Sequence, residues 1–163
     1  MRIFTKKYLP FFLTQWVLVV LILGFSFSRT AADSELLASS TPKDVEKLQE
    51  IFPPNTFNAT QTKYQEFFIN SAKMWNLTDD DIRSLFVVAF CESGWRQYDE
   101  NGNVLSGTEH KPDKGIFQIN SAVHDLDWKT APSNIESALD LFIQDGLKPW
   151  SPSQSCVNKW LSN

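Results

Sequence analysis

The sequence predicts a mostly α-helical or α+β domain in which several helices surround one buried helix. Three observations predict this class. Apolar residues recur at helical spacing in three segments, near residues 61–75, 78–93 and 133–146. The second segment is apolar on nearly all sides, as a central helix is. One hairpin signal, Asn101-Gly102, follows the second segment.

The composition bounds the class of protein further. The 163 residues are 42% hydrophobic and 13% aromatic, which suits one folded domain and excludes a disordered or collagen-like chain. Residues 1–32 contain four basic residues and no acidic one, so residues 33–163 carry 11 basic residues against 19 acidic ones. Because nucleic acid attracts basic surfaces, we expect no nucleic-acid partner.

The first 32 residues are typical of an export signal. Arg2, Lys6 and Lys7 precede a mostly apolar run at residues 11–27. A run of about 17 residues falls between the core of a signal peptide and the roughly 20 residues that span a bilayer. Cleavage after Ala32 gives a signal peptide, and its absence gives a signal anchor. Either outcome places residues 33–163 outside the cytoplasm, in a secreted, periplasmic or inner-membrane-anchored protein.

Residues 33–59 are rich in Ser, Thr, Ala, Pro and Asn, so we expect a flexible linker there and a folded domain at residues 60–163. The first helix of that domain, residues 61–75, carries one apolar stripe that includes Trp75. The second begins at a capping box, Thr78 to Asp81, and ends at Gly94, a residue that suits a left-handed helix end.

The later elements are shorter or follow a loop. Residues 97–100 and 104–106 flank the Asn101-Gly102 turn and predict a small hairpin. A capping box at Ser133 to Glu136 predicts the start of a helix that stops at Gly146, and residues 155–161 predict a last short helix that buries Val157 and Trp160.

Glu92 is the candidate catalytic residue. It follows the apolar run Leu85 to Cys91 and lies near the negative end of its helix. Loss of hydration and the helix dipole both favour the protonated carboxyl, which is what a general acid at neutral pH requires. An ordinary surface Glu in a frayed last turn is the alternative.

Cys91 and Cys156 enter an oxidising environment if the chain is exported. They form either one disulfide or two buried thiols that pack as small apolar side chains. The chain has no C-x-x-C and no H-E-x-x-H pattern, so we expect no metal and no cofactor.

Two motifs carry a family resemblance. Glu92-Ser93-Gly94-Trp95, followed by residues 115–120 with the sequence GIFQIN, resembles the central motifs of lytic transglycosylases in the lysozyme-like superfamily. The resemblance covers roughly residues 60–161. It implies a lysozyme-like domain that cleaves the β-1,4 bond between N-acetylmuramic acid and N-acetylglucosamine in peptidoglycan, with Glu92 as acid and then base and a 1,6-anhydro product.

A hydrolytic muramidase is the close alternative, because most glycosidases use two carboxylates. Asp113 and Asp99 are the candidates for the second. In goose-type lysozymes, which share the fold, the resemblance places an Asp where this chain has Asn120, and an amide cannot act as a base. The sequence therefore favours the anhydro-forming reaction.

The resemblance also implies substrate contacts. Gln118 and the backbone of Ile116 to Ile119 would contact the sugar beside Asn120, and Phe117 would pack under a sugar ring or join the core. Ser93 would bond near Glu92 or the substrate, or only cap the helix. Trp95 and Trp150 are candidates for the walls of a cleft.

The chain departs from the family at one point, since it lacks the Ala-Tyr-Asn segment whose Tyr bonds the catalytic Glu. The partner of Glu92 is therefore not given by the resemblance. A non-catalytic peptidoglycan-binding module is the alternative from another class. Either would fit a role beside cell-envelope machinery such as a secretion or conjugation apparatus, and contact with the membrane through an uncleaved N-terminal segment.

Overall fold

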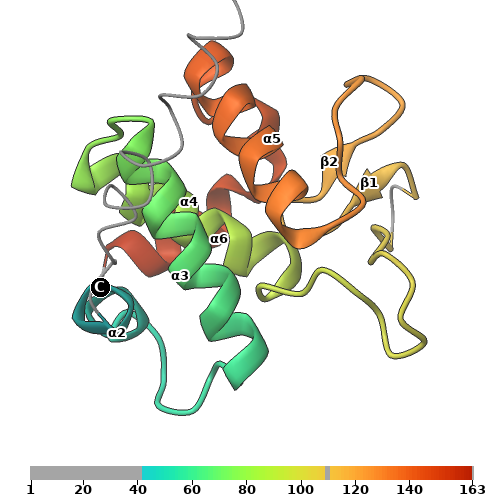
Figure 1. Ribbon diagram of the computed structural model, residues 1–163. Coiled ribbons are helices and arrows are strands. Elements are labelled where there is room, and N and C mark those ends of the chain that lie inside the picture. The colour runs from blue at the N-terminus through green and yellow to red at the C-terminus, as the bar shows by residue number, and fades with distance from the viewer. Residues whose placement is uncertain (1–41, 109–110, 163) are drawn as a thin grey trace, which may run out of the picture. The chain divides into compact units, whose positions relative to one another are not determined.

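The computed structural model describes residues 42–108 and 111–162 (Figure 1). In chain order the elements are α2 (Pro42–Gln49), α3 (Ala59–Met74), α4 (Asp79–Ser93), β1 (Asp113–Lys114), β2 (Ile119–Asn120), α5 (Ala131–Asp145), the 3-10 helix η1 (Lys148–Ser153) and α6 (Gln154–Leu161). The expected signal or anchor at residues 1–32 lies outside the described residues.

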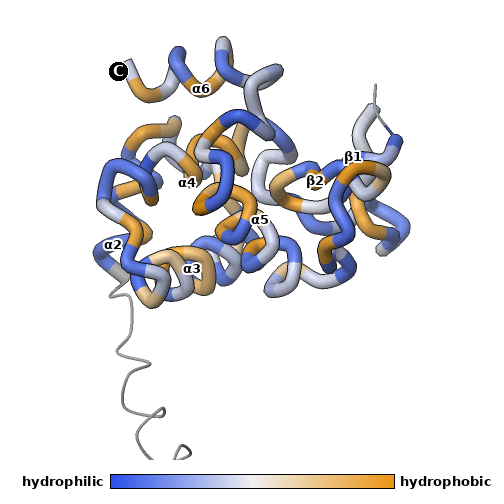
Figure 2. The backbone as a smooth tube through the Cα atoms, turned by 90° about the horizontal axis from the view of Figure 1, so that it is seen from above, coloured by the Kyte–Doolittle hydropathy of each residue, from blue (hydrophilic) through white to orange (hydrophobic). Residues whose placement is uncertain are grey.

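These elements confirm the expected class, a mostly helical domain with a small antiparallel sheet. Helix α4 packs against α3, η1 and α6, and α3 also packs against α5. The two strands lie at one side of the folded unit and α2 at the opposite side (Figure 1). Apolar stretches of α4 and α5 lie in its middle (Figure 2).

The ends of α4 are those that the sequence predicts. Thr78 caps its first turn by accepting from the Asp81 amide, and the Asp81 carboxylate accepts in return from the Thr78 amide. Gly94 ends the helix at φ 63°, ψ 36°, a left-handed conformation that a side chain disfavours. Between the caps, Leu85 to Ala89 are all buried, as expected for a central helix.

Helix α5 begins earlier than its predicted start. The N-cap is Thr130, whose hydroxyl accepts from the Ser133 amide, and Pro132 lies in the first turn. The predicted cap at Ser133 was wrong, because Ser133 is the third residue of the helix and closes the capping box that Thr130 opens. The stop at Gly146 and a last short helix that buries Val157 are confirmed, whereas Trp160, also expected to be buried, is only half-buried.

The expected linker is corrected for residues 42–59. Helix α2 buries Val45 at 2% exposure, and Phe52 just after it is 5% exposed. The Phe52 ring lies 4.2 Å from that of Phe90 and 4.8 Å from that of Trp160, measured between centroids. A short apolar patch in a polar sequence thus belongs to the core, because aromatic rings distant in sequence cover it. Residues 33–41 lie outside the described residues.

The hairpin is also smaller than expected. Only one bridge, between Tyr98 and Val104, spans the Asn101-Gly102 turn. The paired strands lie further along, where β1 and β2 are antiparallel with Asp113 opposite Asn120. The Asp99 carboxylate explains the short bridge, because it accepts from the amides of Asn101 and Asn103 and so closes the turn as a tight loop.

Trp75 was expected in the core and is 40% exposed. Helix α3 ends at Met74, so Trp75 is its C-cap and no longer follows the apolar stripe. Within residues 42–108 and 111–162, no helix combines the length and apolar character needed to cross a membrane.

Candidate active site

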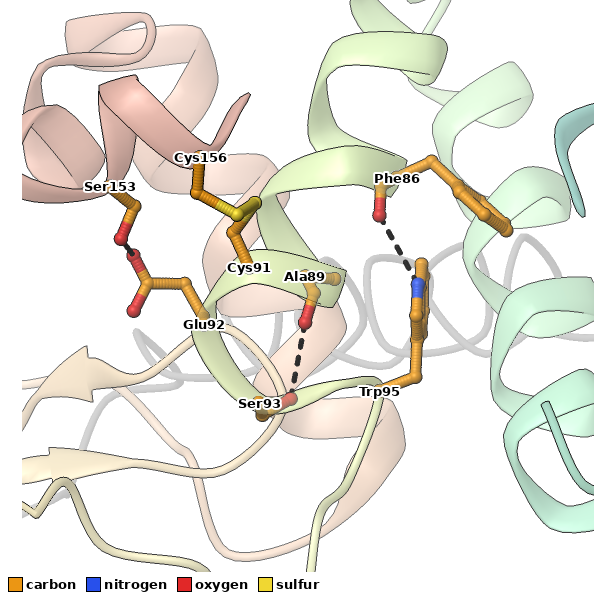
Figure 3. The surroundings of a disulfide bond; sticks show 8 residues. All are labelled: Phe86, Ala89, Cys91, Glu92, Ser93, Trp95, Ser153 and Cys156. Atoms are coloured by element: carbon orange, nitrogen blue, oxygen red, sulfur yellow. Dashed lines mark hydrogen bonds between the residues drawn. A yellow bond between two sulfur atoms is a disulfide. The ribbon is translucent and has the colours of Figure 1, made fainter. Parts of the chain in front are cut away.

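Glu92 lies in the last turn of α4, half-buried beside the chain's C-terminal segment. Its Oε1 accepts a hydrogen bond from the Ser153 hydroxyl at 2.6 Å (Figure 3). The buried residues Leu85 to Ala89 fix the helix that carries it. The core therefore fixes the helix that carries Glu92, and the Ser153 hydroxyl is hydrogen-bonded to its carboxyl.

Three influences act on the pKa of Glu92. Burial raises it most, because a carboxylate loses hydration in the protein. The Ser153 hydrogen bond lowers the pKa, since it stabilises the charged form, and the negative charge of Asp113 raises it. The pKa of Glu92 is raised overall, so the carboxyl keeps its proton to a higher pH than an ordinary Glu.

A disulfide links the segment that carries Ser153 to the helix that carries Glu92. Cys91, the neighbour of Glu92, is bonded to Cys156, which lies 65 residues further along the chain (Figure 3). This pairing confirms the disulfide alternative. The sequence interpretation missed Ser153, although its position three residues before Cys156 was a signal once Cys91 and Cys156 were considered together.

Of the two candidate second carboxylates, only Asp113 influences the pKa of Glu92. Asp113 begins β1, and its charge acts on the Glu92 carboxyl. The Asp99 carboxylate instead serves its own turn, where hydrogen bonds, first of all that from the Asn103 amide, lower its pKa. Asp99 is thus a structural residue of the 99–103 turn.

Ser93 does not hydrogen-bond to Glu92. Its buried hydroxyl donates to the carbonyl oxygen of Ile116 at 2.7 Å and lies 3.2 Å from that of Ala89, and it accepts from the Arg96 amide. Ser93 therefore joins the end of α4 to the loop between β1 and β2. This loop is the segment that the family resemblance expects to contact the sugar.

Two buried amide side chains hold that same loop. Gln97 accepts from the Ile116 amide and donates to the carbonyl oxygen of Trp128, and Asn134 accepts from the Phe117 amide and donates to the carbonyl oxygen of Lys114. A Cβ on Gly115 would lie 2.6 Å from both amide groups. The sequence interpretation missed Gln97 and Asn134, whose roles depend on backbone groups 17 to 31 residues away.

Both tryptophans expected in a cleft are corrected. Trp95 is 0% exposed and Trp150 is 4% exposed. The indole N–H of Trp95 donates to the carbonyl oxygen of Phe86, and that of Trp150 donates to the carbonyl oxygen of Phe117. The chain turns inward after Gly94 and Pro149, so both rings complete the core and satisfy backbone groups.

The other side chains of the segment 115–120 either pack in the core or hydrogen-bond to nearby backbone groups. Phe117 joins the core, one of its two expected places, and Ile119 is buried too. The Gln118 side chain donates to the carbonyl oxygen of Gly115, and the Asn120 side chain accepts from the Ala122 amide. Gln118 and Asn120 remain half-buried and thus partly accessible.

Two hollows lie elsewhere. One of about 550 Å³ lies among α2, α3 and the start of α4, and one of about 510 Å³ lies between α2 and residues 53–57. Glu92 lines neither. Among the described residues, no three His, Cys, Asp or Glu side chains form a group that would hold a metal ion.

Comparison with known protein families, with curated proteins and with solved structures finds no match for this chain.

Proposed function

We propose that this protein is an exported or membrane-anchored lytic transglycosylase with a lysozyme-like fold, which cleaves peptidoglycan glycan strands with Glu92 as general acid and base. The observation that carries the proposal is the state of Glu92. It is a half-buried carboxyl with a raised pKa at the end of a central helix, bonded to one hydroxyl. The substrate class rests on the resemblance of the Glu92-Ser93 and GIFQIN motifs to those of lytic transglycosylases.

The reaction needs one group that gives and then takes a proton. Glu92 protonates the glycosidic oxygen as the bond to the muramoyl C1 breaks. The resulting carboxylate then accepts the proton of the muramoyl 6-hydroxyl, whose oxygen bonds to C1. The raised pKa suits the first step, because an acid at neutral pH must still hold its proton.

A hydrolytic muramidase is the second candidate, and Asp113 favours it. Its negative charge raises the pKa of Glu92, and an Asp is the type of residue that would activate a water molecule or stabilise positive charge at C1 in a hydrolase. Asn120 opposite it carries an amide, which cannot serve as the base. We place the transglycosylase first because one acid/base group suffices for it.

The test is mass spectrometry of the muropeptides that the full chain, purified in mild detergent, releases from peptidoglycan. We expect 1,6-anhydro ends, lighter by one water than reducing ends, and a loss of at least about a hundredfold in rate for Glu92→Gln. Glu136→Gln is the matched control, since Glu136 is exposed on α5. It should release products at the wild-type rate.

Two other outcomes would change the assignment. Reducing ends that disappear in Asp113→Asn as well as in Glu92→Gln would identify a hydrolase with two carboxylates. A folded chain that binds peptidoglycan equally well with and without Glu92, and releases nothing, would identify a binding module and overturn the enzyme.

A further inference from the structure

We infer that Ser153 is a positioning residue for Glu92, and that the segment carrying it is clamped at both ends, by Trp150 and by the Cys91–Cys156 disulfide. This inference rests on the proposed function, in which Glu92 is the acid and base. It assigns Ser153 the place of the partner that neither motif supplies.

The first observation is that the Ser153 side chain does not cap its own helix. Ser153 is the N-cap of α6, a position at which a Ser side chain commonly accepts a hydrogen bond from the first turn of its helix. Its hydroxyl makes no such bond and is directed to Glu92 instead. The Ser153 hydroxyl thus leaves its own helix uncapped and instead bonds to a residue 61 positions earlier in the sequence.

The second observation is the clamp. Trp150 lies three residues before Ser153, and its buried indole donates to the carbonyl oxygen of Phe117 at 2.8 Å. Cys156 lies three residues after Ser153 and is covalently bonded to Cys91, next to Glu92. Both anchors therefore restrict the position of the hydroxyl relative to the carboxyl.

A hydroxyl is chemically suited to this place. It can donate to a carboxylate and accept from a carboxylic acid, so it partners both forms that an acid/base residue alternates between, whereas a Lys or Arg would hold the carboxylate charged. When Ser153 donates to Oε1, the acidic proton of Glu92 resides on Oε2. That oxygen points away from Ser153 (Figure 3) and has no hydrogen-bond partner among the side chains of the described residues.

The inference predicts how Glu92 titrates, which is measurable without substrate. In the full chain labelled with ¹³C at Glu side chains, the Glu92 signal is identified by its loss in Glu92→Gln. Ser153→Ala should raise the pKa of Glu92, because the lost hydrogen bond stabilised the carboxylate. Ser153→Thr, which keeps the hydroxyl, should titrate like the wild type, and so should Ser155→Ala, a control at an exposed serine of α6.

The clamp is tested by combining variants. The double variant Cys91→Ala with Cys156→Ala should also raise the pKa of Glu92. Adding Ser153→Ala to it should change that pKa little further, since loss of the disulfide has already weakened the hydrogen bond between Ser153 and Glu92. If the cysteine variant does not fold, Trp150→Phe with the disulfide intact tests the other anchor and should act in the same direction.

Two results would overturn the inference: an unchanged Glu92 titration in Ser153→Ala, or shifts from the cysteine pair and Ser153→Ala that simply add. In active protein, Ser153→Ala should lower kcat about tenfold and move the alkaline limb of kcat/KM to higher pH, an effect that lost stability alone does not produce. A wild-type chain that releases no muropeptides would reject the proposed function, while the titration would still decide the role of Ser153.

Discussion

The Ser93 hydroxyl donates a hydrogen bond to the carbonyl oxygen of Ile116 at 2.7 Å, across 23 residues of sequence. This bond ties the last turn of α4, which carries Glu92, to the loop between β1 and β2. The candidate acid and the GIFQIN segment are thus joined by the side chain that follows Glu92. Ser93 acts on the geometry of the site without bonding to the carboxyl.

We expect Ser93→Ala to lower the free energy of unfolding by about 1 to 3 kcal/mol, because the buried carbonyl oxygen of Ile116 and amide of Arg96 lose a partner. Urea denaturation measures this loss, with Ser155→Ala as the exposed control. The Glu92 titration should stay that of the wild type. A large pKa change would mean that Ser93 acts directly on the carboxyl.

Gly115→Ala should destabilise the protein by about 2 to 4 kcal/mol. The added Cβ would lie 2.6 Å from the amides of Asn134 and Gln97, and φ at this position is +72°. Gly102→Ala is the matched control, since its φ is +80° but nothing lies within 4 Å of the added atom. It should lose only about 1 kcal/mol. Equal losses in the two variants would contradict the crowding at Gly115.

Glu92→Gln should stabilise the protein, and more so as the pH rises. The folded pKa of Glu92 lies above its unfolded value, so the native state binds more protons between the two pKa values. Stability is therefore highest below the unfolded pKa and falls as the pH rises through the folded pKa. We expect the melting temperature of Glu92→Gln to exceed that of the wild type at pH 7 and to approach it at pH 4. Glu136→Gln should show no such trend.

Removal of the disulfide should cost about 2 to 4 kcal/mol, because the crosslink closes a long loop in the unfolded chain. Reduction should lower the melting temperature by on the order of 10 °C. Scanning calorimetry with and without reductant measures the change. Two thiols that alkylate in the native, unreduced protein, together with an unchanged melting temperature, would show that the bond is not formed.

The sequence alone determined the features that depend on near neighbours. Capping residues and periodicity predicted the start and end of α4, the stop of α5 and the last short helix, since these depend on contacts within a few residues. The same local pattern identified Glu92, because an acidic residue after an apolar run stands out without any structure. It also limited the cysteines to one disulfide or two buried thiols.

The tertiary structure decided everything that joins distant segments. It showed α2 to be part of the core and turned Trp95 and Trp150 inward. It also hydrogen-bonded Ser153 to Glu92 and placed the charge of Asp113 where it raises the pKa of Glu92. A polar side chain such as Ser153 carries no local mark of its partner, because hydrogen bonds between elements depend on where the whole chain packs. The surroundings of the candidate acid, and hence its pKa, follow from packing, whereas its identity follows from the sequence.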